Sequence, residues 1–296
     1  MKAILVTGAN SGIGYLISKK LHQEGYHIFG CSRSEKNFDV FTEMDNVTPI
    51  LLDVTNQETI DKAKDIIKDS EHQLKGLVNN AGTAILAPLI QTPVENISSV
   101  FDVNLLGVHR MILAFSDEII HNKGRIVNIS SISGILSGFA YGNYALSKHA
   151  LEGYSDTLAA EMEKFGVKVS IIEPGGYDTK IVRRLFDDTM TVLDNIPDNP
   201  YQDEIDDWKR RAASLPHGMS QLPTAEAVAD AVHHAVSSKT PKSRYMVTSL
   251  PIESEMTIKG IINEMLQLNQ DHQHSLSLKD LLDVVQEEYT KLQQIK

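Results

Sequence analysis

Short apolar runs alternate with helix-like patterns through the first two-thirds of the chain. Between the runs, apolar side chains recur three or four positions apart, as at Ile13, Leu16, Ile17 and Leu21. Strands that alternate with helices predict βαβ units, in which a parallel sheet carries helices on both faces. The predicted strands lie in KAILVTG (2–8), YHIFGCS (26–32), VTPILLDV (47–54), LKGLVNNAG (74–82), GRIVNIS (124–130), VKVSIIEPG (167–175) and RYMVTS (244–249).

This alternation of strands and helices predicts one doubly wound Rossmann domain of the α/β class over residues 1–250, with no linker that would divide it. Residues 183–223 interrupt this alternation of strands and helices with an acidic stretch rich in proline and aspartate. Because ligands bind beyond the carboxyl ends of the strands, we expect this insertion to form a lid. Residues 251–296 predict a helical extension with one apolar face, which includes Leu278, Leu281 and Val285.

Composition restricts the partners and the compartment. The net charge of −11 and the pI near 5.4 argue against nucleic acid or an anionic membrane surface as a partner. No uncharged apolar run approaches the length of a membrane span, and glycine interrupts MKAILVTGAN too early for a signal peptide. The single cysteine, Cys31, excludes an internal disulfide and fits a cytoplasmic protein. The paired histidines lack an i, i+4 spacing, so we expect no metal site.

The stretch YGNYALSK (141–148) places two phenols and an ammonium close together at the start of a predicted helix. On a helix Tyr144 lies one turn from Lys148, at about 6 Å of rise, whereas Tyr141 lies about 10 Å away. A neighbouring ammonium is expected to lower the pKa of a phenol and bring it closer to the useful range for proton transfer. Alone, the pattern is equally typical of two aromatic side chains and a solvated lysine.

Further motifs follow the predicted strands. TGANSGIG (7–14) joins the first strand to the first helix, where glycines let the backbone approach a pyrophosphate at the positive end of the helix. The other motifs are LDV with Asp53, NNAG (79–82), Asn104 in VNLLG, NISS with Ser131, and PGGYDT (174–179). All of them lie at the carboxyl ends of predicted strands or on a helix that faces those ends.

This set of motifs resembles the short-chain dehydrogenase/reductase family, in its compact branch, from about Lys2 to Thr248. The resemblance implies Tyr144 as the acid/base and Lys148 as its partner, which also bonds the nicotinamide ribose. It implies that Ser131 positions the substrate oxygen and that Asn104 holds a water in a proton relay. The nicotinamide exchanges the hydride, so no metal is needed.

The resemblance also implies the cofactor. NAD-preferring members usually carry a carboxylate at the end of the second strand, where this chain has Ser32 followed by Arg33. We therefore expect Arg33, helped by Ser11 and Ser32, to bind the 2′-phosphate of NADP(H), with NAD(H) the weaker alternative. The expected cofactor-binding residues are Gly8, Ser11, Gly12, Ile13, Gly14, Ser32, Arg33, Asp53, Val54, Asn80, Ala81, Gly82, Tyr144, Lys148, Pro174, Gly175, Tyr177 and Thr179.

The resulting hypothesis is an NADP(H)-dependent oxidoreductase that interconverts a carbonyl and an alcohol. Apolar residues of the predicted lid favour a small hydrophobic substrate, and family habit favours a homodimer or homotetramer. The substrate, the direction of the reaction and the oligomer stay open. The alternative is a non-catalytic NADP sensor or scaffold on the same fold, although such proteins typically lose the tyrosine or the lysine, and this chain retains both Tyr144 and Lys148.

Overall fold

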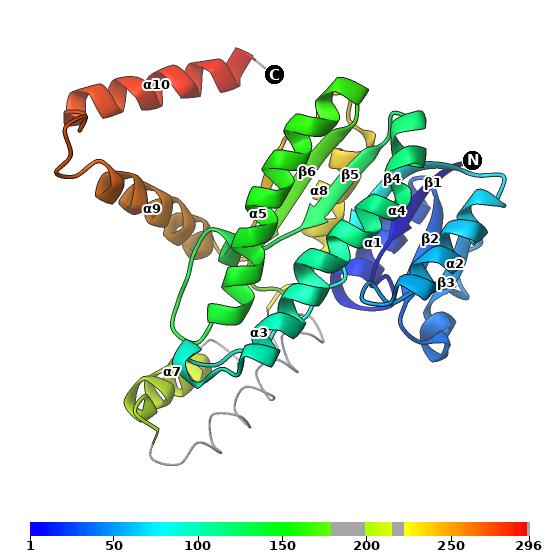
Figure 1. Ribbon diagram of the computed structural model, residues 1–296, viewed down its shortest axis with the longest axis horizontal. Helices are drawn as coiled ribbons and strands as arrows, with labels where there is room; N and C mark the ends of the chain where they lie inside the picture. The colour runs from blue at the N-terminus through cyan, green and yellow to red at the C-terminus, as the bar shows by residue number, and fades with distance from the viewer. Residues whose placement is uncertain (179–198, 215–221, 295–296) are drawn as a thin grey trace.

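A parallel sheet of seven strands forms the centre of the computed structural model, which describes residues 1–178, 199–214 and 222–294 (Figure 1). Its strand order is β3-β2-β1-β4-β5-β6-β7, and every neighbouring pair is parallel. Six of the seven strands lie within the stretches that the sequence predicts, and β4 begins one residue before its stretch. They are β1 (Lys2–Val6), β2 (His27–Ser32), β3 (Val47–Leu51), β4 (Gln73–Asn79), β5 (Arg125–Ile129), β6 (Lys168–Pro174) and β7 (Arg244–Val247).

The two faces of the sheet are covered by different helices. On one face, α2 (Gln57–Lys68), α4 (Gly107–His121) and α5 (Gly142–Met162) share a core cluster with strand residues such as Leu5. On the other face, α1 (Gly12–Gln23) and α8 (Glu226–Ser237) share a second cluster with residues such as Ile4. Successive strand residues point to opposite faces, so a strand buried on both faces is apolar throughout. This burial explains the continuous apolar runs in the sequence.

The segment Val94–His121 is one long helical stretch in three parts. Helix α3 (Val94–Phe101) passes into a π-helical turn, η3 (Asp102–Leu106), and then into α4. Its length and mean hydropathy of 1.3 would suit a membrane span. However, α4 packs against β4 through Met111 and Phe115, which are both fully buried. Packing of this kind is typical of a helix in a protein core.

The predicted lid is described only in part. Thr179 and most of residues 183–223 lie outside the described residues, which include α7 (Gln202–Ser214) within the insertion. Ile205 of α7 is buried, and the Tyr201 ring just before α7 lies 5.5 Å from the Phe139 ring. The remaining short helical turns are η1 (Glu35–Phe41), η2 (Leu89–Gln91), η4 (Ile132–Gly134) and η5 (Glu163–Phe165).

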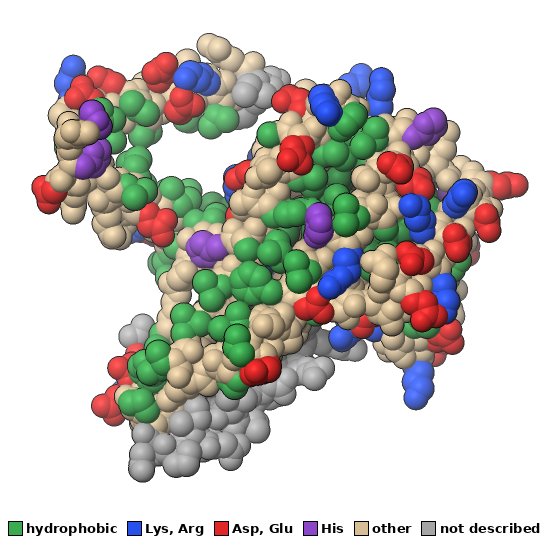
Figure 2. Space-filling view, viewed as in Figure 1, with side chains coloured by type: hydrophobic (Ala, Val, Ile, Leu, Met, Phe, Trp, Pro, Cys, Tyr) green, Lys and Arg blue, Asp and Glu red, His purple; other side chains and the backbone are tan. Residues whose placement is uncertain are grey.

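The chain ends in α9 (Pro251–Leu268) and α10 (Leu278–Gln294), which extend away from the sheet (Figure 1). Ser277 caps α10 by accepting a hydrogen bond from the Asp280 amide. Within these two helices only Thr257 and Leu281 are buried, and Figure 2 shows the pair standing clear of the body. On the apolar face of α10, Leu281 is buried, but Leu278 and Val285 are 69% and 50% exposed, so most of this face is not packed on its own subunit.

Candidate active site

The turn between β1 and α1 forms a close-packed glycine cradle. Gly8 and Gly12 have φ angles of +64° and +53°, a backbone conformation that residues with a side chain disfavour. A Cβ on Gly14 would lie 2.2 Å from the Gly8 carbonyl oxygen, so no side chain fits there. Ser11, the residue before α1, makes no capping hydrogen bond with its side chain. The amides at the start of α1 and the Ser11 hydroxyl are thus left for an anion.

The glycine cradle is braced by the loop that follows β4. The Thr7 hydroxyl oxygen accepts hydrogen bonds from the amides of Asn80 and Ala81, both at 2.9 Å. The Asn80 side chain donates in return to the carbonyl of Thr7 at 2.9 Å. These bonds join the ends of two adjacent parallel strands. A pyrophosphate site on one strand is therefore fixed relative to the residues that follow the next strand, including Gly82.

Helix α5 carries the phenol and the ammonium at its start. Lys148 is 5% exposed, and its Nζ donates to the carbonyl of Ile129 at 2.8 Å. The same Nζ lies 5.7 Å from the centre of the Tyr144 ring. Tyr141 precedes the helix, and its carbonyl accepts the Ala145 amide at 2.8 Å. The geometry therefore pairs Lys148 with Tyr144, as the helical spacing predicts.

The ionisation of this pair differs from the sequence expectation. Burial raises the pKa of Tyr144, and a hydrogen bond with Ser131 lowers it only in part. The expected net lowering by Lys148 is not found, because the ammonium bonds to a backbone carbonyl and desolvation disfavours the phenolate. Burial also lowers the pKa of Lys148 to about 8, against an opposing contribution from Glu152. Both groups are thus moved toward a neutral state at this site.

Ser131 follows β5 and is fixed by a short turn. Its Oγ accepts a hydrogen bond from the Ser133 amide at 3.1 Å and donates to the Pro174 carbonyl at 3.4 Å. Pro174 ends the neighbouring strand β6, so this hydroxyl lies between two strand ends. Its interaction with the Tyr144 phenol places the two predicted substrate-contacting hydroxyls beside each other.

Asn104 lies in the π-helical turn and is 1% exposed. Its Nδ2 donates to the Thr83 carbonyl and to the Ser147 hydroxyl at 2.8 and 2.9 Å. Its Oδ1 accepts the Thr83 amide at 2.8 Å. The amide thus ties the loop after β4 to α5, and both of its N–H groups are already used. A relay water at Asn104 could therefore not accept a hydrogen bond from the side-chain N–H groups and would have to donate one to an oxygen of this residue. π-helical turns often mark functional sites.

The end of β2 presents one free cation. Arg33 is exposed and makes no hydrogen bond or ion pair within the described residues. Ser32 differs from expectation, because it is 1% exposed and its hydroxyl bonds to Ser34 at 3.1 Å. Asp53, after β3, accepts from Thr55 at 2.7 Å. The Arg33 side chain is therefore available to a ligand, whereas the Ser32 hydroxyl is buried and already bonded.

The loop after β6 is held from the carboxyl-terminal extension. Glu253 of α9 accepts the Gly176 amide at 2.7 Å and the Ser249 amide at 2.9 Å. A Cβ on Gly175 would lie 2.5 Å from the same carboxylate. Tyr177 is 3% exposed within the core cluster beside α8, so its backbone, and not its ring, is available to a ligand. Thr179 lies outside the described residues.

Comparison with known proteins identifies the family. The model of the short chain dehydrogenases matches residues 2–190, which is more than half of the chain. The chain belongs to the short-chain dehydrogenase/reductase family. Such an enzyme is an oxidoreductase that acts on alcohol or carbonyl substrates with a nicotinamide cofactor. The glycine cradle fits such a cofactor, because no side chain caps the amides at the start of α1 and Gly14 has no room for a side chain.

Two relatives and one solved structure illustrate the match to this family. The mitochondrial D-beta-hydroxybutyrate dehydrogenase of Bos taurus is 34% identical over 262 residues, which cover 82% of this chain and 76% of the relative. Retinol dehydrogenase 7 of Mus musculus is 32% identical over 257 residues, with shares of 82% and 79%. A short-chain dehydrogenase structure from Streptomyces avermitilis has a TM-score of 0.75 at 26% identity, covering 91% of this chain and 95% of that one.

Three residues at this site are absent from the sequence-based prediction. Thr7 braces the cradle through its hydroxyl, and only its place beside Gly8 at the end of an apolar run could have indicated it. Glu253 holds the loop after β6 from 77 positions away in sequence, so no local pattern marks it. Glu152 is more accessible to prediction, because a carboxylate four residues from Lys148 lies on the same helix face.

Proposed function

We propose that the protein is an NADP(H)-dependent oxidoreductase that interconverts a carbonyl and an alcohol on an apolar substrate. The observation that carries this proposal is that Tyr144, Lys148 and Ser131 lie at one edge of the sheet, with the buried Lys148 Nζ 5.7 Å from the centre of the Tyr144 ring. A sensor or scaffold does not require a buried lysine beside a buried phenol, since burying an ionisable group is unfavourable.

Four residues of the site each have a distinct role in the proposed reaction. The nicotinamide would supply or accept the hydride when bound. Tyr144 gives its proton to the substrate oxygen during reduction and takes it back during oxidation. Ser131 donates a hydrogen bond to that oxygen and fixes its position. Lys148 supplies positive charge that stabilises the phenolate once the proton has left Tyr144. Asn104 keeps α5 and the loop after β4 at a fixed separation.

The preference for NADP(H) rests on charge at the end of β2. The position that would carry a carboxylate is Ser32, and Arg33 beside it has an unpaired guanidinium. A phosphate can accept charge-assisted hydrogen bonds from that group, and no acidic partner within the described residues competes for it. The glycine cradle would hold the pyrophosphate, so both phosphate sites lie at the same edge of the sheet.

The apolar character of the substrate rests on a cavity near the start of α5. It has a volume of about 200 Å³ and lies beside Gly142, two residues before Tyr144. The two relatives are named for a hydroxy acid and for retinol, so their names alone favour neither substrate class. The lining contains apolar and aromatic side chains and no charged residue, which favours the apolar class. The lining residues are Pro88, Leu89, Gly138, Phe139, Ala140, Gly142 and Tyr201.

The test is cofactor turnover with a panel of carbonyl compounds, in which the wild type is compared with Tyr144→Phe and with Tyr141→Phe. Loss of the acid/base should reduce turnover by about 10²- to 10⁴-fold while NADPH still binds. Tyr141→Phe is the matched control and should change turnover little. Equal effects of the two variants would contradict the assignment. A wild-type protein that binds NADPH and turns over no carbonyl would support the sensor alternative.

A further inference from the structure

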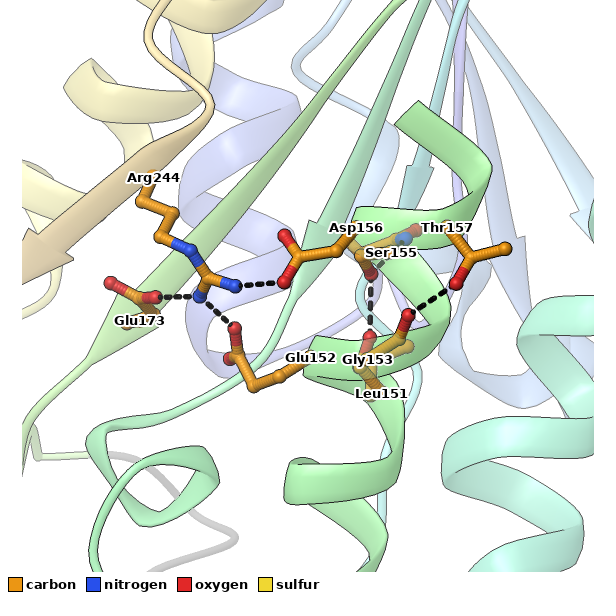
Figure 3. A network of polar contacts seen from close by, with 9 residues as sticks. Leu151, Glu152, Gly153, Ser155, Asp156, Thr157, Glu173 and Arg244 are labelled. Atoms are coloured by element: carbon orange, nitrogen blue, oxygen red, sulfur yellow. Dashed lines mark hydrogen bonds and ion pairs between the residues drawn. The ribbon is translucent and has the colours of Figure 1, made fainter. Parts of the chain in front are cut away.

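Arg244 of β7 joins three carboxylates behind the active site. Its guanidinium contacts Glu173 of β6 at 2.8 Å and Asp156 of α5 at 2.6 Å, and it also contacts Glu152 of α5. Figure 3 shows the four side chains converging from these three elements. Because Glu152, Glu173 and Arg244 are far apart in sequence, this cluster forms only when α5, β6 and β7 are assembled.

The cluster carries more negative than positive charge, and its two glutamates are buried while Arg244 and Asp156 are partly exposed. The side chains of Glu152 and Glu173 are 9% and 3% exposed, whereas that of Asp156 is 59% exposed. Burial, and then the charge of Glu152, raise the pKa of Glu173. One buried atom, Oε1 of Glu152, has no hydrogen-bond partner. A buried carboxylate with a free oxygen is unfavourable unless a nearby positive charge compensates it.

Two positive charges lie near Glu152: Arg244, which contacts its carboxylate, and Lys148 on its own helix. Glu152 lies four positions after Lys148 on α5, so both side chains project from the same face of the helix. The charge of Glu152 raises the pKa of Lys148, against the lowering by burial. Glu152 also lies under the turn that carries Ser131. A Cβ on Gly134 would lie 2.9 Å from Oε1 of Glu152, so the glycine lets this turn approach the carboxylate.

The other charged groups around Lys148 are few. Within the described residues, its own helix contributes the Tyr144 phenol, and the π-helical turn contributes the neutral amide of Asn104, while Asp102 of that turn is paired with Arg110. Strand β6 contributes Glu173, and β7 contributes Arg244, which is bound to Glu152. Glu152 is therefore the carboxylate that acts most directly on the ammonium, while Arg244 fixes where that carboxylate lies.

We propose that Glu152 is a positioning residue for catalysis: Arg244 holds its carboxylate against the Ser131 turn, and the negative charge there attracts the Lys148 ammonium one helical turn away. This role rests on the proposed function, because a charged Lys148 matters for turnover only if Tyr144 transfers a proton. The contact itself can be tested without turnover. At the roughly 6 Å separation of neighbouring helical turns, and at an effective dielectric constant between those of protein and water, one charge shifts a pKa by about one unit.

The first experiment measures the ionisation of Lys148 directly in the whole protein. Acetic anhydride acylates only the neutral amine, so the pH dependence of Lys148 acylation, read by peptide mass spectrometry, follows its pKa. In Glu152→Gln the midpoint should fall by about one pH unit. Asp156→Asn removes an exposed carboxylate from the same arginine and should leave the midpoint in place. Glu152→Asp keeps the charge and should restore most of the shift.

The second experiment follows turnover against pH. Since Glu152→Gln lets Lys148 lose its proton at lower pH, the alkaline limb of kcat should move to lower pH by the same amount, with KM for NADPH little changed. If Glu152 had a purely structural role, Glu152→Gln would lower kcat at all pH values and would not move the alkaline limb of the kcat–pH profile. If the glutamine variant does not fold, Glu152→Met removes the same charge and carries the same expectation.

The outcomes separate the two proposals. An unchanged acylation midpoint in Glu152→Gln, or an equal shift in Asp156→Asn, would overturn the positioning role whether or not the protein turns over a carbonyl. A shifted midpoint in a protein without turnover would overturn the proposed function and leave the electrostatic contact established. A shifted midpoint together with a shifted limb supports both.

Discussion

Replacement of Arg33 by alanine tests the cofactor preference most directly. The guanidinium is exposed and has no intramolecular partner in the described part of the chain, so its removal breaks no contact of the fold. Charge-assisted hydrogen bonds have a net value of about 1.5–3 kcal/mol. At 1.4 kcal/mol for each factor of ten, Arg33→Ala should weaken NADPH binding by about 10- to 150-fold. NADH lacks the 2′-phosphate and should bind almost as before.

The assay is fluorescence titration of both cofactors at constant ionic strength. Salt weakens interactions between exposed charges, and at 0.1 M charges more than about 10 Å apart are largely screened. Lys36→Ala is the matched control, since Lys36 is also exposed and lies three residues farther on. It removes the same net charge and should change NADPH affinity less than twofold if the effect of Arg33 is a direct contact. Equal loss of both cofactors, or an equal effect of Lys36→Ala, would refute the assignment.

Two further changes test the cradle and the extension. Gly14→Ala should abolish cofactor binding and lower the melting temperature, because the new Cβ would lie 2.2 Å from the Gly8 carbonyl oxygen. Its control is Gly153→Ala, where nothing lies within 4 Å and thermal unfolding should show unchanged or slightly higher stability. Truncation after Ser249 removes Glu253 and the exposed apolar helices, so we expect weaker NADPH binding in titrations and a smaller assembly in sedimentation. A truncated chain with wild-type affinity and assembly would contradict that expectation.

The strands and the main catalytic pair could be predicted from the sequence because each is marked by a local pattern of residues. The inner strands β1, β2, β4, β5 and β6 are mostly buried on both faces, so a continuous apolar run marks each of them, and glycine or a polar residue marks its end. Tyr144 and Lys148 lie on one helix, where spacing alone determines that they are neighbours. The motif residues then meet at one edge because parallel strands all end there.

Other features depend on contacts that no local pattern records. Arg244 meets Glu152 across 92 positions of sequence, so their pairing follows from the order of β6 and β7 in the sheet. Ser32 appears available in the sequence, but its hydroxyl is buried and bonds to the backbone of Ser34. The pKa of Tyr144 is also raised where proximity to an ammonium suggested lowering, because the extent of burial depends on the whole fold.

The strand order also determines when the active site can form during synthesis. Strand β1 is the first to leave the ribosome, yet one of its edges pairs only with β4, which ends at Asn79. The brace between Thr7 and Asn80 therefore cannot close until that strand has emerged, and the Arg244 cluster must wait for the last strand. Parallel pairings between distant strands form slowly and leave apolar edges open in the meantime. A nascent chain of this protein is thus most prone to aggregate before residue Arg244 is released.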